Sequence, residues 1–126
     1  MLGYWKIRGL AQPLRYLFEY VEHPWEDVQY EQGEPPEYSI EEWASVKENL
    51  GLDFPNIPYI IDPNHEVRLT DVFAIMVYVS TTYAPELLGS TNEVRAETDL
   101  LYYHLKDIKQ SITAPCYIGH DRNKLT

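Results

Sequence analysis

The first part of the chain pairs a short apolar run with an amphipathic stretch. Residues 2–7 are mostly apolar and aromatic, which is typical of a buried strand. After a turn at Gly9, apolar residues recur at the spacing of a buried helical face, within a helix whose first turn contains Pro13. They are Leu14, Leu17, Phe18 and Val21. We therefore expect a strand and then a helix, which ends before Pro24 because proline disfavours helical geometry at the preceding residue.

Further apolar runs, separated by turn residues, predict three more strands and two more helices before residue 84. Ser39 and Glu42 form a capping-box pattern that should open one helix, and Thr70 is a suitable N-cap for the next. Pro58 lies inside an apolar stretch, where a cis Ile57–Pro58 peptide would turn the backbone. The expected strands are residues 25–30, 57–61 and 66–69, and the expected helices are residues 39–49 and 70–83.

The remainder of the chain is expected to hold a linker and one long helix. Residues 84–91 have linker composition, Asn92 can cap the helix, and Pro115 should end or kink it. The corresponding division is a domain over residues 1–82, a linker over residues 83–91, and a first helix and tail of an incomplete all-helical domain over residues 92–126.

This order of elements predicts an α/β fold. The first strand, helix and strand should form a right-handed parallel unit, and the last two strands an antiparallel hairpin. The result is a β-α-β-α-β-β-α domain with a mixed four-stranded sheet and helices on both faces, followed by the start of an all-α domain. The order, with a proline before the third strand, resembles the thioredoxin-like pattern.

Composition narrows the class of function. The formal net charge of −10 over 126 residues argues against nucleic acid or an anionic membrane as a partner. A single cysteine, Cys116, cannot form an intrachain disulfide, and no apolar run approaches the ~18–20 residues of a membrane span. The histidines lack metal-binding spacing, so we expect no metal site. The expected location is the cytoplasm.

Tyr4 is the candidate for chemistry. It should lie at the end of the first strand, facing the N-terminus of the helix that follows. A tyrosine hydroxyl beside a helix N-terminus can donate a hydrogen bond to an anion, and the helix end adds partial positive charge. A thiolate is such an anion.

Three blocks of sequence resemble the cytosolic glutathione S-transferases, most closely the mu class. They are GYWKIRGLAQP at residues 3–13, GLDFPNIPY at residues 51–59, and RAE at residues 95–97. The resemblance implies a thioredoxin-like glutathione-binding domain and an all-helical C-terminal domain, of which this chain carries only the first helix. It also implies that Tyr4 is the catalytic tyrosine, whose hydroxyl stabilises the thiolate of glutathione.

The same resemblance assigns further contacts. Glutathione-binding positions fall on Trp5, Trp43, Lys47, Asn56, Ile57 and Pro58, and Tyr117 lines the electrophile site. The family holds the γ-glutamyl end of glutathione with a glutamine and a serine, and these positions are Asp71 and Val72 here. Val72 has no hydroxyl and Asp71 places negative charge beside a carboxylate, although the backbone N–H of Val72 and the helix dipole remain. Ile40 replaces an arginine that mu-class proteins usually carry.

The leading hypothesis is a transferase that conjugates glutathione to hydrophobic electrophiles by Tyr4-assisted thiolate attack. Glutathione is then a co-substrate, no cofactor is required, and a homodimer is expected if the full helical domain is present. The alternative is a non-catalytic binding or scaffold module that kept the fold while its glutathione site degraded, which the residues at positions 40, 71 and 72 favour.

Overall fold

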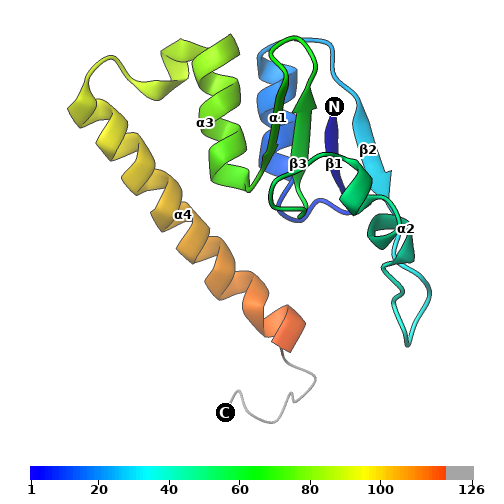
Figure 1. Ribbon diagram of the computed structural model, residues 1–126. Coiled ribbons are helices and arrows are strands. Elements are labelled where there is room, and N and C mark those ends of the chain that lie inside the picture. Colours follow the sequence, from blue (N-terminus) through cyan, green and yellow to red (C-terminus); the bar gives the residue numbers. More distant parts are fainter. Residues whose placement is uncertain (119–126) are drawn as a thin grey trace, which may run out of the picture. The chain divides into compact units, whose positions relative to one another are not determined.

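One mixed sheet organises the first part of the molecule. A computed structural model describes residues 1–118, and its strands are β1 (Leu2–Trp5), β2 (Asp27–Tyr30), β3 (Tyr59–Asp62) and β4 (Val67–Thr70). Their order across the sheet is β2-β1-β3-β4, with β1 and β2 parallel and the other pairs antiparallel (Figure 1). The expected mixed four-stranded sheet is confirmed.

Helices connect and flank these strands. The chain divides into two compact units, Met1–Pro85 and a second that begins at Glu86. The helices are α1 (Gln12–Tyr20), α2 (Glu41–Ala44), the 3-10 helix η1 (Lys47–Asn49), α3 (Val72–Tyr83), the 3-10 helix η2 (Pro85–Leu88) and α4 (Asn92–Ile118). Among residues 1–118, none of them combines the length and the apolar character that a membrane crossing requires.

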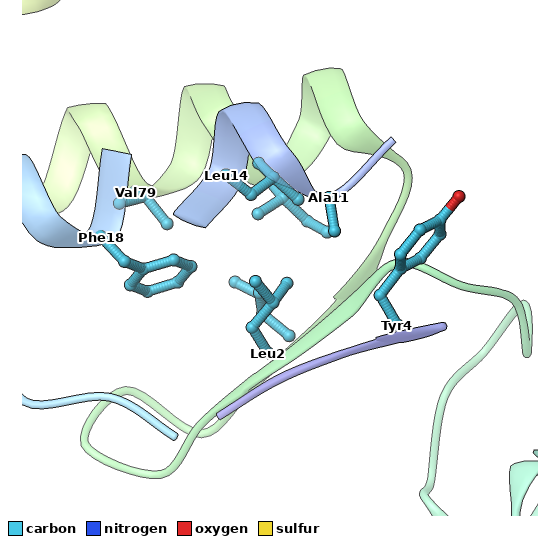
Figure 2. Close-up of a cluster of buried hydrophobic side chains, with 8 residues drawn as sticks. Leu2, Tyr4, Ala11, Leu14, Phe18 and Val79 are labelled. Carbon is cyan, nitrogen blue, oxygen red and sulfur yellow. The ribbon is translucent and has the colours of Figure 1, made fainter. Parts of the chain in front are cut away.

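The larger core lies between the sheet and the helices α1 and α3. Alternate residues of a strand point to the same face, so Leu2 and Tyr4 of β1 both enter this core. Tyr4 lies at one end of the cluster, and Phe18 and Val79 lie at the other (Figure 2). The buried residues are Leu2, Tyr4, Ala11, Leu14, Phe18, Ile60, Ile75 and Val79.

A smaller aromatic core covers the opposite face of the sheet. It contains Tyr30, Trp43, Leu52 and Tyr59, so it attaches α2 to the strands. The Tyr30 and Tyr59 hydroxyls are hydrogen-bonded at 2.8 Å. Gly3 lies opposite Tyr59 in the register, and a Cβ at Gly3 would come within 2.1 Å of the Tyr59 ring. A side chain at position 3 would therefore displace this ring.

Two helix starts differ from those expected. The predicted helix over residues 39–49 is two short helices, α2 and η1, and the capping box does not form because the Glu42 carboxylate accepts instead from the backbone N–H of Glu31. Ser39 still accepts from the N–H of Glu41, at 3.2 Å. For α3, the N-cap is Asp71 rather than Thr70.

The long helix α4 departs from expectation at its start, and of the two outcomes expected at Pro115 an end of the helix is not observed. Thr91 rather than Asn92 supplies the capping side chain, and its hydroxyl accepts from the N–H of Val94 at 3.3 Å. Pro115 does not end the helix, which continues to Ile118. A proline removes one N–H from the backbone ladder, and the hydrogen bonds on either side can hold the helical path around it.

Candidate functional site

Tyr4 combines a buried ring with a hydroxyl at the margin of the core. Only 6% of the residue is exposed, and its oxygen points away from the other side chains of the cluster (Figure 2). The oxygen accepts a hydrogen bond from the backbone N–H of Leu10 at 3.1 Å. A hydroxyl that accepts one hydrogen bond is polarised and becomes a better donor. Tyr4 is thus prepared to donate to an anion.

Gly9 makes this placement possible. Its φ is +40°, a conformation that residues with a side chain rarely adopt. A Cβ at Gly9 would also lie 2.7 Å from the Tyr4 oxygen. Sequence reasoning assigned Gly9 only to a turn. The closeness of the Tyr4 ring adds a second requirement that the turn pattern did not reveal.

The strand register collects several of the predicted residues at one edge of the sheet. Gly3 pairs with Tyr59, and Tyr59 pairs with Thr70, so the end of β1, the residues before β3 and the start of α3 share this edge. We call it the Tyr4 edge. It contains Tyr4, Trp5, Ile57, Pro58, Asp71 and Val72.

The segment before β3 is held by local contacts. The Asn56 side-chain oxygen accepts from the backbone N–H of Ile57 at 2.9 Å. The Ile57–Pro58 peptide is cis, as the sequence suggested. Ile57 packs against both cores, as does Trp5. This backbone is therefore anchored beside Tyr4, and its exposed hydrogen bond can be exchanged for one to a ligand.

The other predicted contact residues, Trp43, Lys47 and Tyr117, are not part of the Tyr4 edge as defined above. Trp43 is 6% exposed and packs against the rings of Tyr30 and Tyr59, at centroid distances of 5.4 and 5.8 Å. Lys47 is half exposed and pairs with Glu48 at 3.6 Å. Tyr117 contributes to the α4 backbone, and its side chain lies outside the described part of the chain. The structure thus gives Trp43 a packing role in the aromatic core.

Asp71 changes the electrostatics at the start of α3. Its carboxylate accepts from the N–H groups of Phe73 and Ala74, at 2.9 and 3.2 Å. Helix N-termini attract anions through such free N–H groups. Here the protein's own carboxylate occupies two of them. Sequence reasoning placed charge at Asp71 but missed its capping role, although aspartate is a preferred N-cap.

Comparison with known proteins finds related sequences. No family model matches the chain. It is 40% identical over 116 residues to Glutathione S-transferase 2 of Gallus gallus, and 42% identical over 116 residues to Glutathione S-transferase Mu 1 of Oryctolagus cuniculus. Glutathione S-transferase Mu 4 of Homo sapiens is 39% identical. Each alignment covers 92% of this chain and 51% of the relative.

Solved structures share the fold. The glutathione S-transferase Blo t 8 has a TM-score of 0.81 at 25% identity, over 97% of this chain and 52% of that one. The pi-class glutathione S-transferase of Onchocerca volvulus has a TM-score of 0.76 at 20% identity, over 95% and 51%, and shows the fold alone. The chain spans about half the length of the curated relatives it matches. Over that span, the chain is a homologue of the mu-class glutathione S-transferases.

Proposed function

We propose that this protein binds glutathione at the Tyr4 edge and conjugates it to hydrophobic electrophiles. The observation that carries the proposal is the Tyr4 hydroxyl, which accepts from Leu10 and faces away from the core at the end of β1. The relatives are named as transferases, which supports the enzyme over the non-catalytic alternative. A cytoplasmic location and a homodimer belong to the same proposal.

In the proposed reaction, Tyr4 stabilises the ionised form of the thiol. A free thiol with a pKa of about 8.5 is mostly protonated at neutral pH, whereas the thiolate is the nucleophile. The Tyr4 hydroxyl donates to the thiolate sulfur, and the thiol proton leaves to solvent. The sulfur then attacks the electrophilic carbon, a C–S bond forms, and the leaving group departs with its electron pair, or the electrons move into the acceptor in an addition.

The remaining contacts orient glutathione. The backbone of Ile57, preceding the cis proline, pairs with the cysteinyl residue in the manner of a strand. The Ile57 N–H gives up its hydrogen bond to the Asn56 side chain and donates to the ligand instead. Trp5 and Lys47 border the tripeptide, Trp43 keeps its packing position in the aromatic core, and Tyr117 faces the electrophile.

The γ-glutamyl end is the weak part of this site. A ligand carboxylate at the start of α3 would meet the Asp71 carboxylate, which already accepts from the N–H groups of Phe73 and Ala74. Val72 adds no hydroxyl. Like charges at close range cost about 1 kcal/mol when solvated and more when buried, so binding should be weaker than at a neutral site.

A titration tests the proposal. Reduced glutathione is added to the protein and tryptophan fluorescence is followed, because Trp5 lies at the Tyr4 edge. Saturable binding in the millimolar range or below is expected. An absence of binding throughout that range would refute the proposal that this chain is a glutathione-conjugating enzyme.

The variant Asp71→Asn isolates the charge at the γ-glutamyl end. Asparagine is as good an N-cap as aspartate, so the helix start and the free energy of unfolding should change little. Removing the charge should tighten glutathione binding by about fivefold to tenfold. Asp53→Asn, a change of the same kind at an exposed loop residue, is the control and should leave the affinity unchanged. Equal affinities for the two variants would mean that the carboxylate of glutathione does not lie beside Asp71.

A further inference from the structure

A cavity lies at the opposite end of the sheet from Tyr4. It has a volume of about 390 Å³, within the range of small-molecule sites. The register places the start of β1 beside the end of β3, where the N–H of Ile61 donates to the carbonyl of Met1 at 3.0 Å. We call this end of the sheet the Met1 edge. The cavity is bordered there by Met1, by residues 23–26 and by residues 60–64, and α3 closes it from one side.

Aromatic and aliphatic side chains line the cavity. The rings of Phe18 and Trp25 stack with centroids 5.1 Å apart, and those of His23 and Tyr83 stack at 4.6 Å. Ile60 and Val79, both buried, add aliphatic surface. Such a lining suits a ligand with an apolar or aromatic body, and the faces of the rings attract positive charge.

Two carboxylates accompany this aromatic lining. Glu26 and Asp62 both border the cavity. Burial opposes ionisation of Asp62, but hydrogen bonds from Tyr83, Tyr78 and His65 outweigh it and hold the pKa of this carboxyl well below its usual range. Asp62 therefore remains charged at neutral pH.

The helix ends add to this field. Tyr83, the last residue of α3, lines the cavity, and His23 follows the end of α1, so the C-terminal ends of two helices lie beside it. Helix C-termini carry partial negative charge. The positive group among the residues that line the cavity is the α-amino group of Met1, which donates to the carbonyl of Ile61 at 3.0 Å. The balance of charge around the cavity favours a cationic ligand over an anionic one.

We propose that the cavity at the Met1 edge binds an organic cation, namely a protonated or quaternary amine attached to an aromatic or bulky apolar group. The apolar body lies against Phe18, Ile60 and Val79, and the charged head lies among the rings near Glu26. This site is separate from Tyr4 and does not depend on glutathione.

Benzyltrimethylammonium is a suitable probe, and phenylacetate is a matched anion of similar body. Each is titrated into the protein without glutathione, with the indole N–H signals of the tryptophans followed by nuclear magnetic resonance. We expect the cation to bind about tenfold tighter than the anion and to shift the signal of Trp25. Trp5 and Trp43 lie outside the cavity lining and provide the internal reference.

A charge-matched pair of variants tests the location. Glu26→Lys reverses an exposed charge at the cavity and should weaken binding of the cation by about tenfold. Glu37→Lys makes the same change of net charge in an exposed loop outside the lining, and should leave the affinity within about twofold. Equal effects of the two variants, equal affinities for cation and anion, a shift confined to Trp5 and Trp43, or no binding of millimolar cation would each overturn the proposal.

Discussion

At the Tyr4 edge, a buried ring presents its hydroxyl outward, and a glycine and one backbone N–H hold it there. At the Met1 edge, by contrast, polar groups face one another. The Asp62 carboxylate accepts from Tyr78 at 2.7 Å, from Tyr83 at 2.5 Å and from the N–H of Asn64 at 3.0 Å.

The difference shows two uses of tyrosine in one small sheet. A hydroxyl that donates a hydrogen bond to a carboxylate of another element links the two elements. Here such bonds join α3 to the hairpin of β3 and β4. Burial and the hydrogen bond to Asp62 raise the pKa of Tyr83 to about 12, so this donor keeps its proton. Tyr4 accepts from the backbone instead, which leaves its proton for a ligand. Substitutions at either edge test this difference.

The largest effect on stability is expected from Gly9→Ala at the Tyr4 edge. The positive φ and the clash with Tyr4 together should lower the free energy of unfolding by about 2–3 kcal/mol. The matched control is Gly51→Ala, which also has a positive φ, of +66°, but meets only the Arg68 side chain, at 3.5 Å. It should cost about 1 kcal/mol and leave Tyr4 in place.

Denaturant unfolding measures both costs, and glutathione conjugation measures the displacement of Tyr4. Conjugation should fall more in Gly9→Ala than in Gly51→Ala under conditions where both variants are folded. Equal losses of activity would mean that Gly9 does not position the Tyr4 ring.

Tyr83→Phe tests the Met1 edge. The change removes one donor from a charged acceptor, so the free energy of unfolding should fall by about 1.5–3 kcal/mol. Tyr16→Phe, at a tyrosine that is 68% exposed on α1, is the control and should change stability by less than about 0.5 kcal/mol. Thermal or denaturant unfolding of the two variants gives the comparison, and a Tyr83→Phe variant as stable as the control would contradict a structural role for the carboxylate network.

Acid should weaken the Met1 edge through the same carboxylate. Because folding lowers the pKa of Asp62 below its ordinary value of 3.8, its stabilising contribution is fully present above that pH. The contribution is lost as the pH falls below about 4 toward the lowered pKa. Asp62→Asn should therefore reduce stability at neutral pH and flatten its decline in acid. Denaturant unfolding over a pH series measures this, and parallel curves for the variant and the unaltered protein would exclude Asp62 as a source of the decline.

The sequence predicted the sheet and the helices α1 and α3 because these follow from local periodicity and from continuous motifs, and it placed Tyr4 in the first strand before the turn at Gly9. It failed where contacts are distant along the chain. Glu42 was assigned to a capping box, but it accepts from Glu31, 11 residues away. Asp62 has partners, Tyr78 and Tyr83, that lie 16 and 21 residues further on, and no local pattern indicates these pairs. Only the folded register shows such pairs.

The most direct test of the central claim is the thiol pKa of bound glutathione. Thiolate absorbance is followed over a pH series with saturating protein, for the unaltered chain and for Tyr4→Phe. We predict a bound thiol pKa at least about one unit below the free value of about 8.5, and a return toward that value in Tyr4→Phe with binding retained. The same thiol pKa in both proteins would contradict the role assigned to Tyr4.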